Sequence, residues 1–189
     1  LDFASDVLAI ADEGFRQISV EPVSAEENCD YALREEDLPR ICAEYEKLAE
    51  IMKDRHDFNF FHFNVDLSQG PCVIKRIRGC GAGCEYVAVT PEGDIYPCHQ
   101  FVGREEYKLG NVHEEGFNLE VSERFAGLNV YTREECADCW AKFYCTGGCS
   151  ASNLVVNGDV KKPNHVACEM ERKRLECAIA LKAAAAAEE

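Results

Sequence analysis

The chain has 189 residues and a mass of 21.1 kDa, and 47% of its residues are hydrophobic and 29% are charged. This composition is typical of a globular protein, and no apolar run approaches the roughly 18 residues that a membrane-spanning helix needs. The formal net charge of −15 disfavours a nucleic-acid partner, because an acidic surface repels phosphate backbones. The first residues carry acids where a signal peptide would carry bases, so we expect a cytoplasmic protein.

Residues 1–66 predict alternating helices and strands. In chain order we expect a helix over 2–15, a strand over 17–23, a helix over 34–55 and a strand over 57–65. Pro39 fits only in a first turn, so the long helix should begin near Asp37. This order is typical of a parallel α/β sheet, but two strands cannot bury such a sheet on both faces. We therefore interpret residues 1–66 as part of a larger domain.

Residues 67–189 predict short hairpins and cysteine-bearing loops. One hairpin should run over 85–96 with its turn at Pro91-Glu92-Gly93, and a second should turn at Asn157-Gly158. Thr132 and Glu135 have the spacing of a capping box, which would open a helical turn carrying Cys136 and Cys139. From about Val166 the pattern is helical to the end.

Twelve cysteines dominate the chemistry of this sequence, and four of them form the pattern Cys136-x2-Cys139-x5-Cys145-x3-Cys149. Without a secretory signal the thiols should stay reduced, so clustered thiols indicate metal binding rather than disulfides. Structural zinc sites usually use two close pairs separated by a longer loop. The compact spacing here therefore favours an iron–sulfur cluster over zinc.

Further cysteines extend this pattern on both sides. Cys80 is followed by Gly93 and then, after four residues, by Cys98, and the hairpin between them should return Cys98 to the vicinity of Cys80. Cys168 lies downstream. Together these seven cysteines match the motif C-x9-15-G-x4-C, C-x2-C-x5-C-x3-C, C of the SPASM domain of radical S-adenosylmethionine (SAM) enzymes. The resemblance extends from about Cys80 to Cys168, close to half of the chain.

The resemblance implies two auxiliary 4Fe-4S clusters with interleaved ligands. Cys80, Cys98 and Cys149 would bind auxiliary cluster I, whose fourth position would be filled by Cys84 or left open for a substrate thiolate. The ligands of auxiliary cluster II would be Cys136, Cys139, Cys145 and Cys168. Cys149 would thus connect the second motif to the first cluster, which would make metal loading part of folding.

The sequences around these cysteines, at 79–83, 85–93 and 95–103, resemble those of ribosomal-peptide maturases, most closely the thioether-forming maturases of six-cysteine (SCIFF) peptides. Maturases of quinohemoprotein subunits have similar sequences in this region. In an intact enzyme the resemblance implies cleavage of SAM, hydrogen abstraction from a peptide backbone, and bonding of a substrate cysteine sulfur to the resulting carbon. The auxiliary clusters would position the substrate or accept the surplus electron. A cysteine-containing precursor peptide and an electron donor such as ferredoxin or flavodoxin would be the partners.

The sequence departs from this family in one respect. The SAM-cleaving cluster needs C-x3-C-x2-C, but Val87 and Ser152 stand where the third cysteine would follow Cys84 and Cys149. We therefore expect residues 1–66 to be the C-terminal strands and helices of a partial (β/α) radical SAM barrel, and residues 67–189 to be a SPASM domain of hairpins, short helices and a C-terminal helix. The rest of the barrel, with SAM and a third 4Fe-4S cluster, would lie outside this chain. Alone, the chain should not generate a radical.

Two other functions fit the cysteines: a stand-alone iron–sulfur electron carrier and a structural zinc module. The remaining cysteines are expected not to be ligands, namely Cys29, Cys42, Cys72 and Cys177. Cys42 in particular lies on the apolar stripe of the long helix, where a thiol behaves as a small hydrophobic group. Glu21 follows a barrel-like strand, and we expect packing or capping there rather than a role facing a cofactor.

Overall fold

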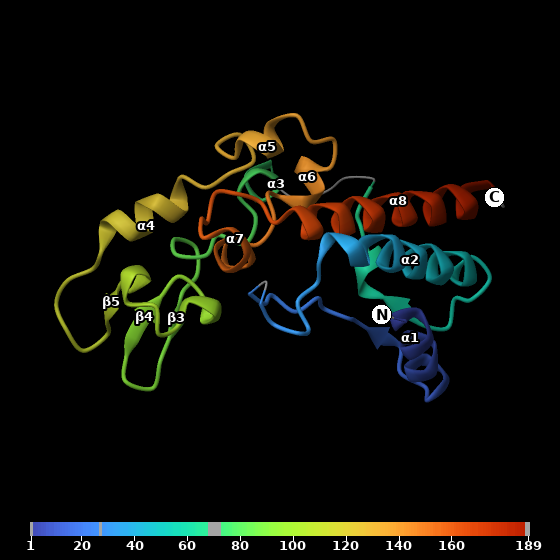
Figure 1. The fold of residues 1–189 in the computed structure, drawn as a ribbon, viewed down its shortest axis with the longest axis horizontal. Coiled ribbons are helices and arrows are strands. Elements are labelled where there is room, and N and C mark those ends of the chain that lie inside the picture. The colour runs from blue at the N-terminus through green and yellow to red at the C-terminus, as the bar shows by residue number, and fades with distance from the viewer. Residues whose placement is uncertain (1, 27, 68–72, 188–189) are drawn as a thin grey trace. The chain divides into compact units, whose positions relative to one another are not determined.

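The computed structural model describes residues 2–26, 28–67 and 73–187, and the chain divides into two compact units. The first unit comprises Leu1–Gly70 and Asn164–Glu189, and the second comprises Pro71–Pro163. Both contain helices, and both contain a small sheet (Figure 1). The mixed α/β and α+β character expected from the sequence is confirmed, although the described strands do not close a barrel. None of the helices in the described ranges has the length and apolarity to span a bilayer.

The first unit is built on two short parallel strands. Its elements are α1 (Phe3–Asp12), β1 (Gln17–Ile18), α2 (Leu38–Met52), β2 (Asn59–Phe60) and α8 (His165–Ala187), with 3-10 turns at Glu35–Asp37 and Phe61–Phe63. Gln17 pairs with Asn59 and Ile18 pairs with Phe60 in parallel register. Because α2 connects the two strands, the segment has the βαβ arrangement that the sequence predicts. Both strands are shorter than expected.

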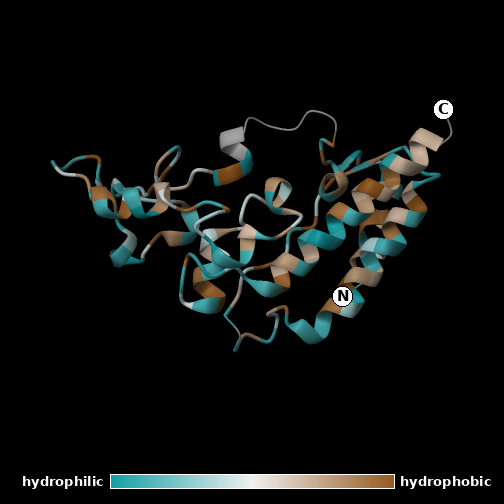
Figure 2. Cartoon of the chain, turned by 90° about the horizontal axis from the view of Figure 1, so that it is seen from above, coloured by the Kyte–Doolittle hydropathy of each residue, from teal (hydrophilic) through white to brown (hydrophobic). Residues whose placement is uncertain are grey.

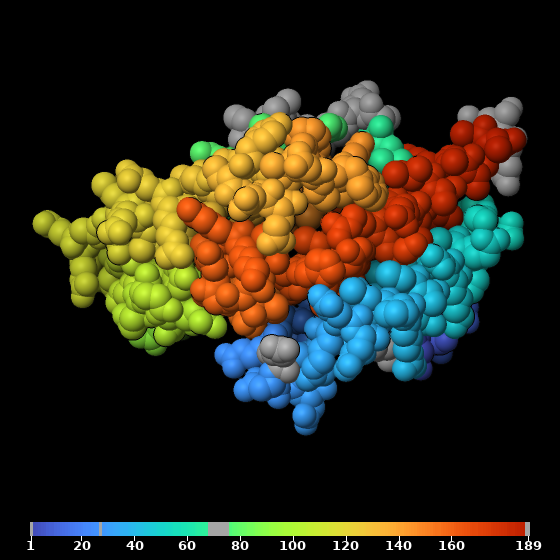
Figure 3. All heavy atoms as spheres, turned by 45° about the horizontal axis from the view of Figure 1, so that its top comes forward, coloured from blue at the N-terminus to red at the C-terminus, as the bar shows by residue number. Residues whose placement is uncertain are grey.

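The helices of the first unit pack through apolar stripes. In α2, Ile41, Tyr45 and Leu48 are buried at the spacing of one helix face, and Pro39 lies in the first turn as predicted. Bands of hydrophobic and hydrophilic residues alternate around the helices of this unit (Figure 2). α8 packs along α2 and adds Met170 and Cys177 to the same core (Figure 3).

α8 therefore belongs to the first compact unit, whereas the sequence analysis grouped this helix with residues 67–189. The physical reason is the apolar face of α2, which a two-stranded sheet and α1 leave partly uncovered and which α8 buries. The division of the chain into two evolutionary domains near residue 66 remains a prediction.

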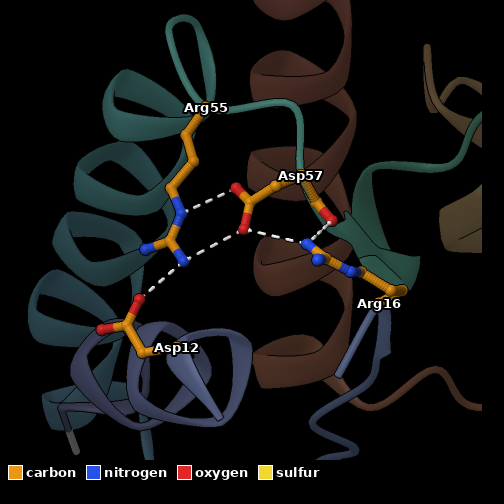
Figure 4. Close-up of polar contacts among 4 residues, drawn as sticks. All are labelled: Asp12, Arg16, Arg55 and Asp57. Atoms are coloured by element: carbon orange, nitrogen blue, oxygen red, sulfur yellow. Dashed lines mark hydrogen bonds and ion pairs between the residues drawn. The ribbon is translucent and has the colours of Figure 1, made fainter. Parts of the chain in front are cut away.

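An ion-pair network holds the amino-terminal ends of the two strands together (Figure 4). Arg55 donates from Nε to Asp57 Oδ1 at 2.8 Å and from Nη2 to Asp12 Oδ1 at 2.6 Å. Arg16 donates to Asp57 Oδ2 at 3.2 Å, and its carbonyl accepts from the Asn59 amide at 2.8 Å. The hydrogen bond from Arg55 lowers the pKa of the Asp57 carboxyl group. The network thus joins α1 to both strands.

The second unit contains a three-stranded antiparallel sheet, β3 (Ala88–Val89), β4 (Asp94–Tyr96) and β5 (Gly110–Asn111). Its helices are α3 (Val73–Arg78), α4 (Leu119–Ala126), α5 (Glu134–Ala137), α6 (Lys142–Cys145) and α7 (Ser150–Asn157), with 3-10 turns at His99–Phe101 and Glu105–Tyr107. The predicted hairpin is confirmed, and Gly93 takes a φ of 90° in its turn. Phe101, Tyr107 and Phe125 form the aromatic centre of the core in this unit.

The second predicted hairpin is wrong. Residues 150–157 form α7, and Gly158 ends that helix in the left-handed conformation with a φ of 70°. The Asn157 side-chain amide donates to the carbonyls of Lys162 and Pro163, both at 3.0 Å. An Asn-Gly pair serves a helix C-terminus as well as a hairpin turn, because both require a positive φ.

The predicted capping box is also wrong. α5 begins at Glu134, and its N-cap residue is Arg133 rather than Thr132. The Thr132 hydroxyl instead accepts from the Asn129 amide at 2.9 Å and donates to the Gly127 carbonyl at 2.9 Å. Thr132 is therefore used in the preceding turn, where a hydroxyl satisfies backbone groups equally well. The helical turn carrying Cys136 is nevertheless present.

Candidate metal centre

The loop that carries Cys80 and Cys84 is shaped by glycines. Gly79, Gly81 and Gly83 all have a positive φ, between 70° and 80°. The Gly83 amide donates both to the Tyr86 carbonyl at 2.9 Å and to the Pro97 carbonyl at 3.1 Å. Since Pro97 directly precedes Cys98, the second of these bonds ties the Cys80 loop to the strand end that carries Cys98.

Three of the expected ligands surround one tyrosine. The Tyr86 hydroxyl hydrogen-bonds with the sulfur of Cys98, and Tyr86 also interacts electrostatically with Cys80 and Cys149. Burial and these thiols together raise the pKa of Tyr86 to about 12. Burial raises the pKa of the Cys98 thiol, while the hydrogen bond from Tyr86 opposes that effect. The structure thus brings Cys80, Cys98 and Cys149 around a common neighbour.

The cysteines of the second motif lie in or next to three short helices. Cys136 lies in α5 and is buried, Cys139 follows that helix, Cys145 is the last residue of α6, and Cys149 is the N-cap residue of α7. The Cys139 amide donates to the Cys136 carbonyl at 3.1 Å, and the two thiols interact electrostatically. An x2 spacing within one turn therefore places two sulfur atoms near each other, as the motif predicts.

A tight turn connects Cys145 to Cys149. Thr146, Gly147 and Gly148 take φ values of 61°, 91° and 71°, so three successive residues are left-handed. A Cβ on Gly79 would lie only 3.0 Å from Oγ1 of Thr146. The loop that precedes Cys80 and the turn that follows Cys145 are consequently in close contact, and Gly79 permits this approach.

The two remaining expected ligands, Cys84 and Cys168, do not lie among the cysteines described above. Cys84 is exposed, and its thiol donates to the Gly81 carbonyl at 3.4 Å. Cys168 lies on α8 in the first unit, where it is half-buried and where its amide donates to the Asn164 carbonyl at 3.0 Å. Cys136, Cys139 and Cys145 thus belong to the second unit, and Cys168 belongs to the first.

No disulfide joins the cysteines in the described ranges. Among the same residues, no three Cys, His, Asp or Glu side chains converge in the geometry of a single-ion site. Each thiolate of a 4Fe-4S cluster binds a different iron atom, so cluster ligands surround a larger volume than the ligands of one zinc ion. The donor set of thiols, the left-handed turns and the hydrogen bond to Cys98 fit the requirements of such a cluster.

Of the cysteines expected not to be ligands, Cys177 is 5% exposed and packs in the core of the first unit. Burial raises the pKa of Cys42 and raises that of Cys177 to about 11. Cys29 is half-buried near the surface. Cys72 lies outside the described residues.

Glu21 is exposed and ends a chain of hydrogen bonds that begins in the core of the first unit. His62 is 1% exposed, and its ring nitrogens lie 3.0 Å from the Tyr45 hydroxyl and 3.2 Å from Glu21 Oε1. Glu21 and Tyr45 also line a cavity of about 290 Å³ in the first unit. Glu21 thus hydrogen-bonds to a buried histidine, and the expectation that it packs or caps rather than faces a cofactor stays a prediction.

Sequence analysis did not single out Tyr86 or Arg133 as functional residues. Tyr86 lies in a family-like segment, but no spacing rule marks a tyrosine as a partner of a cysteine twelve residues later. Arg133 is 4% exposed, and its guanidinium donates to the Gly147 carbonyl and to Ser150 Oγ. Nothing in the sequence around a single arginine predicts that its side chain will be buried.

Known proteins resemble this chain in sequence and in fold. Residues 80–140 match the family model of SPASM, described as an iron–sulfur cluster-binding domain. An uncharacterized protein of Archaeoglobus fulgidus is 31% identical over 99 residues, which are 51% of this chain and 24% of that protein. The PqqA peptide cyclase of Xanthomonas axonopodis pv. citri is 31% identical over 84 residues, which are 42% of this chain and 22% of that protein.

Solved structures show the same fold. Native anSMEcpe with bound AdoMet and Kp18Cys peptide aligns with 95% of this chain and 52% of its own chain, at a TM-score of 0.59 and 19% identity. The structure with the Cp18Cys peptide aligns with 98% of this chain and 54% of its own, at a TM-score of 0.61. The chain thus spans about half the length of these enzymes and about a quarter of the two curated relatives.

Residues 80–140 are thus similar to SPASM iron–sulfur cluster-binding domains. Together with the sequence similarity to a PqqA peptide cyclase, this match is consistent with the C-terminal part of a radical SAM/SPASM peptide maturase.

Proposed function

We propose that this chain is the auxiliary 4Fe-4S portion of a radical SAM enzyme that forms thioether cross-links in a ribosomally made peptide. The observation that carries the proposal is the gathering of Cys80, Cys98 and Cys149 around Tyr86. Cys149 belongs to the second cysteine motif by sequence, yet its neighbours are cysteines of the first motif. This crossing supports the interleaved ligand scheme that the family resemblance implies.

The ligand assignment follows from that scheme. Cys80, Cys98 and Cys149 would bind auxiliary cluster I, with Cys84 or an open position as the fourth site. The ligands of auxiliary cluster II would be Cys136, Cys139, Cys145 and Cys168. When bound, the clusters supply thiolate-ligated iron that positions the substrate or takes up an electron. Tyr86 donates to the Cys98 sulfur, and burial of Cys98 and Cys136 excludes water from two ligand positions.

Two boundaries belong to the same proposal. Residues 1–66 correspond to the C-terminal strands and helices of the radical SAM barrel, which the parallel pairing of β1 with β2 supports. Residues 67–189 correspond to the SPASM region with its C-terminal helix. SAM, a third 4Fe-4S cluster and an electron donor such as ferredoxin or flavodoxin would act through the remainder of the enzyme. The chain alone would then be inactive.

The substrate would be a cysteine-containing precursor peptide, as in the SCIFF family. Thioether formation removes one hydrogen atom from a backbone carbon, and the thiol loses its proton as the sulfur–carbon bond forms. One electron is left over, and it must leave through an acceptor. Each cross-link therefore lowers the peptide mass by two hydrogen atoms.

Metal loading tests the cluster part of the proposal. The chain is reconstituted anaerobically with iron and sulfide, and its iron content is compared among Cys98→Ala, Cys136→Ala and the control Cys42→Ala. We expect the first two variants to lose iron and the control to keep it, since Cys42 lies on α2 in the first unit. Equal iron in all three variants would refute the assignment.

Peptide chemistry tests the other part. A full-length enzyme containing this chain is incubated with SAM, a reductant and a cysteine-containing peptide, and the peptide mass is followed. Loss of two hydrogen atoms together with loss of the free thiol would support thioether formation. Loss of the hydrogens with the thiol retained would point to a different peptide modification.

A further inference from the structure

Arg133 is a buried cation placed between the two halves of the second cysteine motif. It precedes Cys136 by three residues, and its side chain reaches forward to the segment around Cys149. Nη1 donates to the carbonyl oxygen of Gly147, and Nη2 donates to Ser150 Oγ at 2.9 Å. These two acceptors lie on either side of Cys149 in the chain.

The contact of Arg133 with the turn extends beyond its hydrogen bonds. A Cβ on Gly147 would lie 3.4 Å from Cδ of Arg133, so the apolar stem of the arginine runs along the turn. Thr146, Gly147 and Gly148 are all left-handed, and such a run has no regular hydrogen-bond ladder of its own. The planar guanidinium group of Arg133 donates to one acceptor on each side of Cys149, and this fork of hydrogen bonds can hold the turn in a single conformation.

The charge of Arg133 also falls where thiolates are expected. Arg133 is 4% exposed, and burying a guanidinium group is costly unless negative charge compensates it. The guanidinium group lies close enough to Cys136 for its charge to act on that thiol. Thiolates that bind a cluster would add negative charge close to this cation.

We propose that Arg133 is a positioning residue of the metal centre: its fork holds the Gly147–Ser150 segment against Cys136, and its charge stabilises the ligand thiolates. This inference rests on the proposed function, because it requires that the thiolates bind a cluster. Two separable consequences follow. Loss of the fork should weaken cluster retention, and loss of the charge should make reduction of the cluster harder.

The experiment compares the reconstituted full chain with Arg133→Gln, Arg133→Lys, Ser150→Ala and the control Lys161→Gln. The control removes one positive charge from an exposed position in the same unit. For each variant the iron and sulfide contents, the rate of iron loss to a chelator and the midpoint potential of the clusters are measured. None of these readouts requires enzymatic activity.

We expect Arg133→Gln to shift a midpoint potential to more negative values and to lose iron several-fold faster, because a cation near a cluster favours its more reduced, more negative state. Arg133→Lys and Ser150→Ala keep the charge, so they should lose iron faster with a smaller change in potential. Lys161→Gln should match the wild type in every readout.

Wild-type iron retention and potential in Arg133→Gln would overturn the inference. If that variant fails to fold, Arg133→Lys and Ser150→Ala decide, and wild-type iron retention in both would overturn it. A wild-type chain that binds no iron would instead overturn the proposed function itself, and the inference with it. The two failures are therefore distinguishable from the wild-type measurement alone.

Discussion

Gly79 and Thr146 are in close contact although 67 positions separate them in the sequence, and a Cβ on Gly79 would lie 3.0 Å from Oγ1 of Thr146. Gly79 directly precedes Cys80, and Thr146 directly follows Cys145. The packing of these two residues therefore helps to hold the first cysteine loop against the second cysteine motif.

The first prediction follows from this contact. Gly79→Ala forces a residue with a φ of 75° to carry a Cβ against Thr146. We expect a loss of about 2 kcal/mol or more in the free energy of unfolding, of which about 1 kcal/mol is the backbone cost of a left-handed alanine. Gly103→Ala is the matched control, because Gly103 has a φ of 83° and a Cβ added there would meet no atom within 4 Å. Equal losses in denaturant titrations of both variants would contradict a role for the contact.

The second prediction concerns the hydrogen bond between Tyr86 and Cys98. Hydrogen bonds to a ligand sulfur stabilise the more negative, reduced state of a cluster. Tyr86→Phe should therefore move a cluster midpoint potential to more negative values in a redox titration followed by electron paramagnetic resonance.

Tyr96→Phe is the control for this experiment. Tyr96 lies in β4 of the same unit, but its hydroxyl donates to Glu105 Oε1 at 3.4 Å rather than to a cysteine. The account predicts an unchanged potential for Tyr96→Phe. A shift of equal size in both variants would show that the potential responds to loss of any nearby tyrosine hydroxyl and not to the bond with Cys98.

The third prediction concerns thiol reactivity in the metal-free chain. Burial raises the pKa of Cys177 to about 11, so at pH 8 only about one molecule in a thousand carries the reactive thiolate there. Cys80, Cys84 and Cys149 are exposed. Brief alkylation at pH 8 followed by mass spectrometry should label these three cysteines well before Cys177. Early labelling of Cys177 in the folded chain would contradict its place in the core.

The sequence predicted correctly those elements in which every local signal indicates the same structure. In α2, the apolar stripe through Ile41, Tyr45 and Leu48 and the position of Pro39 specify both the helix and its first turn. Asn157 and Gly158 misled because a positive φ serves a hairpin and a helix end equally, and the choice depends on a helix that has already begun at Ser150. The roles of Tyr86 and Arg133 arise only from packing between distant segments, which no local pattern records.

The fourth prediction concerns the pH dependence of the first unit. Burial of His62, assisted by the charge of Arg174, lowers the pKa of its imidazole below the usual value of 6.5, while Glu21 opposes this. The unfolded chain thus binds a proton more readily than the folded chain. The contribution of His62 to stability is fully present above about pH 6.5 and is lost as the pH falls through its lower folded pKa.

Chemical denaturation between about pH 7.5 and pH 5 checks this prediction. The decline in stability toward low pH should be shallower in His62→Gln than in the wild type. His113→Gln, which changes an exposed histidine of the second unit, should keep the wild-type slope. Parallel slopes in His62→Gln and the wild type would show that His62 does not contribute.

The central claim is that the cysteines of this chain bind two 4Fe-4S clusters. Anaerobic analysis of iron, sulfide and zinc in the reconstituted chain, together with its visible absorption spectrum, tests that claim most directly. The account predicts about eight iron and eight sulfide per chain with broad sulfur-to-iron absorption. Stoichiometric zinc without sulfide would contradict it and would make the chain a cysteine-rich structural module.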